Sequence, residues 1–303
     1  MENIRDGSWA TMVTPFTDRG DIDYKAVESL AEWYIDKGAD GIFAVCQSSE
    51  MFWLSFEERH ELAKFILDAV GAKIEVIVCG NVEEDMAAQI KEARAFAELE
   101  PKAVVFVSNR LECGMGFMSA VDKILRKMPD DVPLGIYECP HPSKRLLTDD
   151  ECRHLVQTGR FVFLKDTSCD VATMARRAAI VSGSAFKLYN ANAATLYETL
   201  RFGYSGYCGV MANYHPDLYA WLCKNFADER AARLEKYLGM MSVIECRQYP
   251  HSAKRYLKLF EGLDMNELCR SQNGPLASSI DCELRDVYEI SQEMRKYIKE
   301  VLV

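Results

Sequence analysis

A lysine that ends an apolar run is the first candidate for chemistry in this 303-residue chain. Lys165 closes the run FVFLK and is followed directly by Asp166. Burial disfavours the charged ammonium and leaves a free amine, which can attack a carbonyl carbon. A lysine in this position can equally be a structural group that pairs with Asp166 or with another carboxylate. Lys165 is therefore a candidate nucleophile with a structural alternative.

A tyrosine ends the preceding apolar run. Tyr137 closes the run LGIY and lies 165 − 137 = 28 residues before Lys165, which is about the length of one strand–helix unit. A phenol beside an amine can move a proton or stabilise an oxyanion. Alone, such a tyrosine is more often a rim residue whose hydroxyl is already hydrogen-bonded. The spacing predicts that the two side chains lie on neighbouring strands, at the same end.

A short polar string follows an earlier apolar run. Gln47, Ser48 and Ser49 come directly after the run that ends at Cys46. Backbone N–H groups in such a turn, together with a hydroxyl, can bind a small carboxylate. The string is common in loops, so taken alone it is a weak signal.

The elements that must position these residues follow from a regular alternation of apolar runs and amphipathic stretches. Runs of four to six apolar residues suit strands buried on both faces, and the stretches between them have helical periodicity. Eight strand–helix units in series predict a TIM (β/α)8 barrel rather than an open doubly wound sheet, because no G-x-G-x-x-G follows the first strand. The expected strands are 9–13, 41–46, 74–79, 103–107, 134–137, 161–165, 186–190 and 206–211. The expected helices are 24–37, 56–70, 86–99, 118–127, 149–158, 171–182, 193–202 and 216–226.

The remainder of the chain reads as a helical appendage. We expect residues 1–226 to form the barrel and residues 227–303 to pack on it, with helical stretches at 229–246, 253–259 and 282–302. Active sites of such barrels lie where the strands end. The sequence therefore places the candidate residues at one rim and predicts that the appendage is not a second catalytic domain.

Composition excludes several classes of function. The net charge of −10, with no basic run, argues against nucleic acid and anionic membranes as partners. No stretch approaches about 18 apolar residues, so no membrane span is expected. The eleven cysteines form no C-x-x-C pair, so we expect buried thiols rather than a metal site. Because the first residues lack the apolar core of a signal peptide, a reducing cytoplasm is the expected compartment.

Several strings resemble one family, in its order and spacing. They are GSWATMVTPFTDRGDID, KGADGIFAVCQSSEMFWLSFEER, GIYECP, LKDTS and GYSGYCGVMANYHP. The chain resembles the dihydrodipicolinate synthase and N-acetylneuraminate lyase family from about residue 7 to residue 226. The resemblance implies a TIM barrel with chemistry of the class I aldolase type. It also implies a homotetramer and requires neither a metal nor an organic cofactor.

The resemblance also implies roles for single residues. Lys165 would form an imine with pyruvate or another 2-keto acid, and Tyr137 would position the substrate and move the proton. Ser48 with Ser49 would bind the pyruvate carboxylate. Together with the polar positions near the other strand ends, the expected substrate-binding residues are Gln47, Ser48, Ser49, Asn190, Asn192 and Cys208.

The chain departs from the synthase pattern at three places. Gln47 stands where the family has the first hydroxyl of a G-T-T-G-E string, so the proton relay is incomplete or rebuilt from other groups. The tyrosine usual after strand four is absent, with Ser108 and Asn109 in that region. Pro142 occupies the place of an arginine that binds the second substrate, and the nearest cations are Lys144 and Arg145.

The pocket for a second substrate departs from the sialate lyase pattern. Asn190 and Asn192 are followed by Ala193 and Ala194, where carboxylates would hold sugar hydroxyls. Four side chains near the rim suggest a less polar second substrate, although the aromatic ones could also pack against a neighbouring subunit. They are Met51, Phe52, Trp53 and Cys139.

Three functions are open at this stage. The first is a lyase or aldolase that forms a Schiff base with pyruvate or another 2-keto acid, in the direction of cleavage, condensation or dehydration. The second is dihydrodipicolinate synthase itself, with Lys144 or Arg145 in place of the missing arginine. The third is a 2-keto-acid sensor without turnover. The incomplete proton relay favours this function, and the presence of both Lys165 and Tyr137 argues against it.

Overall fold

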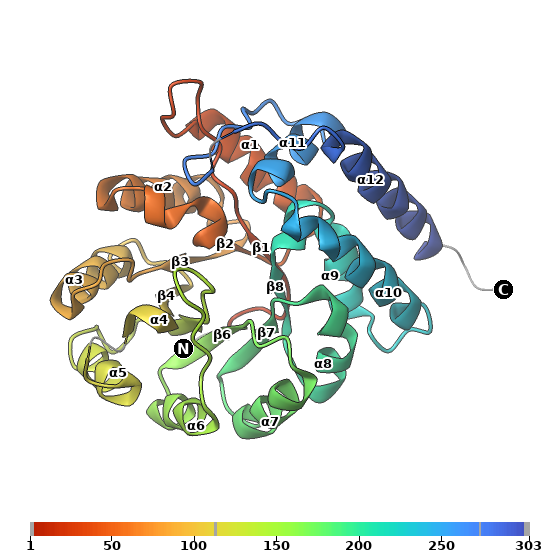
Figure 1. Cartoon of the computed structure of the whole chain (residues 1–303). Coiled ribbons are helices and arrows are strands. Elements are labelled where there is room, and N and C mark those ends of the chain that lie inside the picture. Colours follow the sequence, from red (N-terminus) through yellow and green to blue (C-terminus); the bar gives the residue numbers. More distant parts are fainter. Residues whose placement is uncertain (1–2, 112–113, 273, 300–303) are drawn as a thin grey trace.

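Eight parallel strands close into a barrel in the computed structural model, which describes residues 3–111, 114–272 and 274–299 (Figure 1). Each strand pairs with the next in the chain, and β1 pairs with β8. The predicted TIM barrel is therefore confirmed. The strands are β1 Gly7–Thr11, β2 Gly41–Val45, β3 Glu75–Cys79, β4 Ala103–Val107, β5 Leu134–Tyr137, β6 Phe161–Asp166, β7 Lys187–Asn190 and β8 Gly206–Gly209.

Helices surround the sheet, and side-chain caps fix where several of them begin. A capping box of Ser55 and Glu58 starts α2, and Thr148 with Glu151 forms another at α6. The helices around the barrel are α1 Tyr24–Asp36, α2 Phe56–Val70, α3 Met86–Ala97, α4 Ser108–Leu111, α5 Phe117–Leu125, α6 Asp149–Thr158, α7 Val171–Val181, α8 Leu196–Phe202 and α9 Pro216–Lys224. Short 3₁₀ helices follow three strand ends: η1 Gln47–Ser49 and η2 Met51–Trp53, η3 Ala193–Thr195, and η4 Val210–Asn213.

Aromatic rings fill the inside of the barrel. Trp9 of β1 contacts Phe163 of β6 with ring centroids 5.7 Å apart, and Phe43 of β2 contacts Tyr137 of β5 at 5.6 Å. Strands so far apart in the sheet can share ring contacts only across the lumen. Gly41 makes room for this packing, because a Cβ there would lie 2.3 Å from the Trp9 ring. The barrel interior is therefore filled with side chains, and this packed aromatic floor lies beneath the candidate site.

Alternation along β6 decides where its two charged residues point. Phe163 faces the lumen, so Lys165, two residues later, faces the lumen as well, and Asp166 faces the helices. Asp166 Oδ2 lies 2.6 Å from Arg177 Nη1 of α7 and accepts a hydrogen bond from Tyr204 Oη at 2.7 Å. Arg177 also pairs with Glu138, and all three charged side chains are fully buried. The Asp166 carboxylate is thus held away from Lys165.

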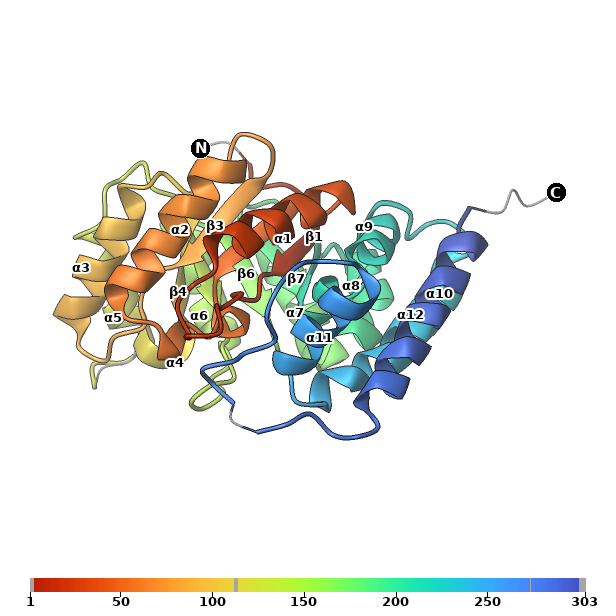
Figure 2. The same cartoon turned by 90° about the horizontal axis from the view of Figure 1, so that it is seen from above.

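The tail packs along one side of the barrel, next to α8, α9 and α1 (Figures 1 and 2). Its elements are α10 Ala231–Met241, η5 Ser242–Cys246, α11 His251–Phe260 and α12 Ile280–Tyr297. The single helical stretch expected at 229–246 is wrong in its last turn, because α10 ends at Met241 and tightens into η5. The last residues of the stretch expected at 282–302 lie outside the described residues. The domain division after residue 226 stays a prediction.

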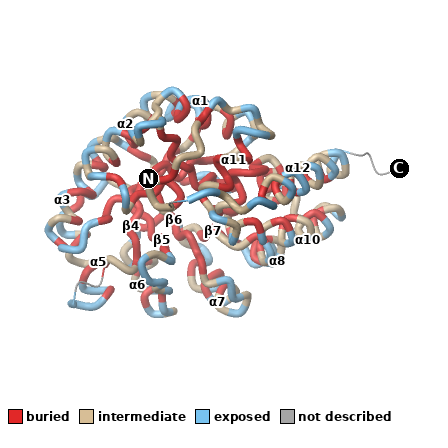
Figure 3. Tube along the Cα trace, turned by 45° about the horizontal axis from the view of Figure 1, so that its top comes forward, coloured by how far each residue is buried: buried red, intermediate tan, exposed pale blue. Residues whose placement is uncertain are grey.

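The eighth strand is shorter than predicted. It ends at Gly209 rather than Met211, because the backbone turns into η4 there. Buried residues are concentrated in the strands and in the inward faces of the helices (Figure 3).

The composition led us to expect buried thiols and no membrane span, and the structure bears on both. Ten cysteines lie in the described part of the chain and all are free; six of them are buried, while Cys113 lies outside the described residues. None of the described helices is both long and apolar enough to cross a membrane.

Candidate active site

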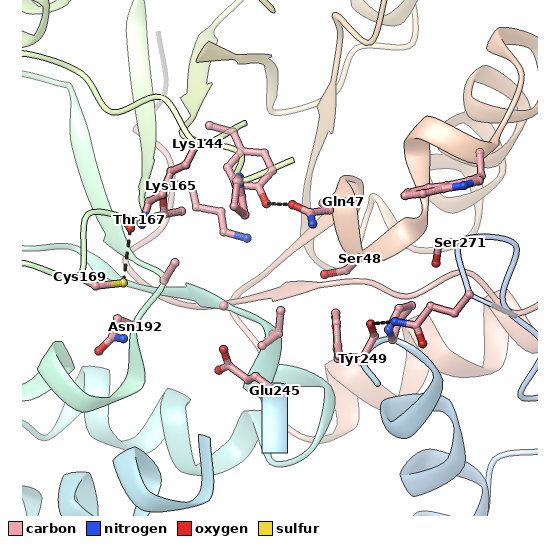
Figure 4. Close-up of a pocket in the computed structure, with 18 residues that line it drawn as sticks. Gln47, Ser48, Lys144, Lys165, Thr167, Cys169, Asn192, Glu245, Tyr249 and Ser271 are labelled. Carbon is pink, nitrogen blue, oxygen red and sulfur yellow. Dashed lines mark hydrogen bonds between the residues drawn. The ribbon is translucent and has the colours of Figure 1, made fainter. Parts of the chain in front are cut away.

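A cavity of about 370 Å³ opens at the carboxyl ends of the strands, above the aromatic floor (Figure 4). Five of the eight residues expected to be catalytic or substrate-binding line it: Gln47, Ser48, Tyr137, Lys165 and Asn192. Ser49, Asn190 and Cys208 do not line it. This is the end of the barrel where the sequence places the chemistry.

Lys165 is buried without a counter-ion. The residue is 4% exposed, and its Nζ lies 4.5 Å from the centre of the Tyr137 ring. Lys165 and Tyr137 are paired across β5 and β6, so the prediction of neighbouring strands is confirmed. Within the described residues no carboxylate lies within ion-pair distance of Nζ, and Asp166 is bound to Arg177 instead. The structural alternative, a Lys165–Asp166 pair, is therefore wrong.

The hydroxyl of Tyr137 donates a hydrogen bond to a side-chain amide. Tyr137 Oη donates to Gln47 Oε1 at 3.4 Å, and Cys139 Sγ donates to the same oxygen at 3.3 Å. Burial raises the pKa of Tyr137 well above its ordinary value of 10, and that of Cys139 to about 11. Both groups are therefore protonated at neutral pH. Tyr137 can donate a hydrogen bond to a substrate oxygen, but its phenol is a poor base.

The turn after β2 contributes Ser48 to the cavity and uses Ser49 to hold itself together. Ser49 Oγ lies 2.7 Å from the carbonyl oxygen of Met12 and 2.5 Å from that of Ala44, so its hydroxyl is taken up by the backbone. Ser48 lines the cavity beside Gln47. A carboxylate bound here would meet the Ser48 hydroxyl and the Gln47 amide nitrogen.

The two asparagines after β7 have different surroundings. Asn190 is fully buried, and its Nδ2 donates to Thr195 Oγ1 at 2.9 Å and Thr199 Oγ1 at 3.1 Å. It also accepts a hydrogen bond from the backbone N–H of Asn192, so it shapes the turn that carries Asn192 into the cavity.

Cys208 is buried in β8, and burial raises the pKa of its thiol to about 12.

The two cations after β5 also differ. Arg145 pairs with Glu151 at 2.5 Å and lies 4.5 Å over the ring of Phe117. Lys144 is exposed and lines the mouth of the cavity. Of the two, only Lys144 is placed to meet a ligand.

The residues after β4 fasten this loop. Asn109 Nδ2 donates to the carbonyl oxygens of Cys139, His141 and Ser143 at 3.0, 2.9 and 2.6 Å. Ser108 Oγ donates to the carbonyl oxygen of Arg145 at 2.8 Å. Neither residue lines the cavity, so neither takes the place of the missing tyrosine.

The tail supplies part of the cavity wall, which the sequence did not lead us to expect. Glu245 of η5 lines the cavity together with Tyr249, Ser271 and Gln272 (Figure 4). A buried ion pair holds these loops in place: Lys254 Nζ lies 2.8 Å from Glu50 Oε1, and Glu50 Oε2 accepts from the Ser271 N–H at 2.7 Å. The 3₁₀ turn that aims Glu245 inward leaves no mark in hydrophobic periodicity.

Within the described ranges, no three His, Cys, Asp or Glu side chains gather where they could hold a metal ion. A nearly buried amine beside a phenol, at the ends of two barrel strands, provides the groups for imine chemistry. Fold and site together define a TIM-barrel lyase of the class I aldolase type.

Comparison with known proteins gives the family. Residues 5–290 match the model of the dihydrodipicolinate synthetase family, so the chain belongs to that family. The 4-hydroxy-tetrahydrodipicolinate synthase of Clostridium perfringens strain SM101 is 24% identical over 290 residues, 92% of this chain and 93% of that protein. The synthase of Thiobacillus denitrificans is 28% identical over 221 residues, 72% of this chain and 73% of its own.

Solved structures share the fold. The chloride-inhibited dihydrodipicolinate synthase of Acinetobacter baumannii, complexed with pyruvate, superposes with a TM-score of 0.84 at 24% identity, over 95% of this chain and 99% of that one. The enzyme of Cyanidioschyzon merolae with lysine bound gives 0.86 at 22% identity, over 96% and 99%.

Proposed function

We propose that the protein forms a Schiff base between Lys165 and pyruvate or another 2-keto acid, and uses it to make or break a bond of a second substrate. The observation that carries this proposal is the buried Nζ of Lys165, which has no counter-ion among the described residues and faces the cavity 4.5 Å from the Tyr137 ring. An amine in this environment is available to attack a carbonyl carbon.

The surrounding groups support binding of a 2-keto acid. The Ser48 hydroxyl and the Gln47 amide can bind the carboxylate, and the Tyr137 hydroxyl can donate to the oxygen that leaves the carbinolamine as water. The nitrogen lone pair then forms the C=N bond as the C–O bond breaks. The protonated imine is an electron sink, so cleavage, condensation and dehydration are all accessible from it.

Borohydride trapping tests the proposal. Pyruvate plus borohydride should add a reduced pyruvyl group to the wild-type chain, detected by intact mass and mapped to the peptide with Lys165. Lys165→Ala should abolish the adduct, whereas Lys144→Ala, which removes the other lysine of the cavity, should keep it. An unmodified wild-type chain would rule the proposal out.

One observation favours a second candidate, 4-hydroxy-tetrahydrodipicolinate synthase. Lys144 lies at the cavity mouth, where it can bind the carboxylate of a second substrate, although Arg145 is committed to Glu151. A coupled assay with pyruvate and aspartate semialdehyde decides between this activity and a different second substrate. Turnover at the level of the Lys165→Ala variant would exclude the synthase.

Homotetramer formation stays a prediction from the family resemblance. Sedimentation velocity of the full chain measures it directly.

A further inference from the structure

A carboxylate from the tail reaches the cavity without a partner. Glu245 lies in η5, and in Figure 4 its carboxylate and the Lys165 amine both point into the cavity, from different walls. Glu245 is half-buried, and within the described residues it makes no hydrogen bond or ion pair. Among the described residues that line the cavity, it is the one acidic side chain. A desolvated carboxylate left unpaired in the same cavity as the Lys165 amine calls for a functional explanation.

Burial and one nearby lysine set the ionisation of Glu245. Burial raises its pKa from an ordinary 4.5 to about 7, and Lys165 opposes part of this rise. Both forms of the carboxyl are therefore populated near neutral pH, as a general acid or base requires. The titratable groups whose charges interact with it are Lys165 of β6, Cys169 of the following loop, Tyr207 of β8, Tyr214 after η4, and Tyr219 of α9.

Before substrate binds, the other polar groups near Lys165 are poor bases at neutral pH. Tyr137 donates to Gln47 Oε1, and an amide has no proton to pass on and little basicity. Burial raises the pKa of the phenol and keeps it protonated until it gives its proton to the leaving hydroxyl. Imine chemistry nevertheless needs a base, because the carbon next to the imine must lose a proton to form the enamine.

We propose that Glu245 is the general base of this site and removes the proton from C3 of the imine that Lys165 forms with pyruvate. The inference rests on the proposed Schiff base. The carboxylate takes the C3 proton, the C–H electron pair becomes the C2=C3 bond, and the C=N pair moves onto nitrogen. The products are the neutral enamine and the protonated Glu245, which exchanges its proton with water through the cavity mouth.

Exchange of the pyruvate methyl protons in heavy water tests this step without a second substrate. Proton NMR follows the loss of the methyl signal with the wild-type chain. Glu245→Gln should still form the borohydride-trapped adduct on Lys165 but should exchange about 10²-fold or more slowly, the contribution typical of a positioned base. Glu235→Gln is the matched control, because burial raises the pKa of this tail carboxylate too, yet it does not line the cavity. It should exchange at the wild-type rate.

The pH profile separates a base from a structural role. The wild-type exchange rate should rise with pH and level off above about 7, where Glu245 is ionised. Glu245→Gln should lose this inflection, and Glu245→Asp should regain part of the rate together with the inflection. A Glu245→Gln variant that exchanges as fast as wild type, or that no longer forms the adduct, would overturn the inference. A wild-type chain that forms no adduct would instead overturn the proposed function.

Discussion

Two lysines are buried in the part of the chain that the structure describes, and they differ in what surrounds the side-chain nitrogen. Lys254 of α11 is fully buried, with Nζ 2.8 Å from Glu50 Oε1 and 2.7 Å from the carbonyl oxygen of Leu268. Lys165 is 4% exposed and has no such partners among the described residues. The first holds the tail loops against the turn after β2, and the second faces a cavity. Burial alone therefore does not distinguish the two lysines, and the proposed nucleophile is the one that is buried without a counter-ion.

The same contrast recurs in neighbouring pairs along the chain. Asp166 is bound to Arg177 while Lys165 is left open, and Arg145 is bound to Glu151 while Lys144 faces the cavity mouth. In each pair one charge serves the scaffold and the adjacent one is available to a ligand. Substitutions that separate stability from ligand binding test this division.

The largest effect should come from removing the paired lysine. Lys254→Met leaves Glu50 buried without its counter-ion, and we expect a loss of about 3–5 kcal/mol in the free energy of unfolding, measured by urea denaturation. Adding Glu50→Gln should recover part of this loss, because no uncompensated charge remains. Lys165→Met should leave the free energy of unfolding unchanged or raise it. Equal losses in the two methionine variants would break the comparison.

The next largest effect concerns the hydroxyl beside the unpaired lysine. Tyr137→Phe keeps the ring that lies 4.5 Å from Lys165 Nζ and removes only the hydroxyl that donates to Gln47. We expect the rate of adduct formation with pyruvate to fall about 10²-fold, because the leaving hydroxyl loses its proton donor. The adduct should still form at long times. Stopped time courses analysed by intact mass measure the rate, and a wild-type rate would show that the hydroxyl takes no part.

Much of this arrangement was predictable from the sequence. All eight strands lie within a few residues of their expected positions, because short apolar runs bounded by polar residues are a local signal. The meeting of Lys165 and Tyr137 follows from their position at the ends of consecutive strands of a closed sheet. Side-chain alternation then decides that Lys165 faces inward and Asp166 outward, which the sequence alone left open.

The remaining features depend on contacts between distant segments. The Ser49 hydroxyl is hydrogen-bonded to the backbone carbonyl oxygens of Met12, just after β1, and Ala44 of β2, and nothing in the sequence distinguishes it from Ser48 in this respect. Glu245 reaches the cavity only because α10 tightens into η5 and the Lys254–Glu50 pair holds the loops around it. Tertiary packing decides such placements, so the sequence assigned the tail no part in the site.

A smaller effect should separate Lys144 from Arg145. Lys144→Ala should raise by about 10-fold the concentration of a dicarboxylic 2-keto acid, such as 2-oxoglutarate, that half-saturates adduct formation, because a carboxylate loses its cation. Pyruvate should be affected less, and stability should not change. Arg145→Ala should leave ligand binding unchanged and lower the free energy of unfolding by about 1 kcal/mol, because the pair with Glu151 is lost. Identical ligand effects in both variants would mean that the two cations are not divided in this way.

The smallest effect links the unpaired lysine to Glu245 through stability. Burial raises the pKa of Glu245 from 4.5 to about 7, so the folded state favours the protonated carboxyl. The contribution of Glu245 to the free energy of unfolding is therefore fully present below about pH 4.5, and it is lost as the pH rises to about 7. Glu245→Gln should therefore match wild type at about pH 4 and exceed it at about pH 8, by on the order of 1 kcal/mol after allowance for partial exposure. Since Lys165 holds this pKa down, the gain should be larger in a Lys165→Met background, and a gain that is the same in both backgrounds would show that the two groups do not interact.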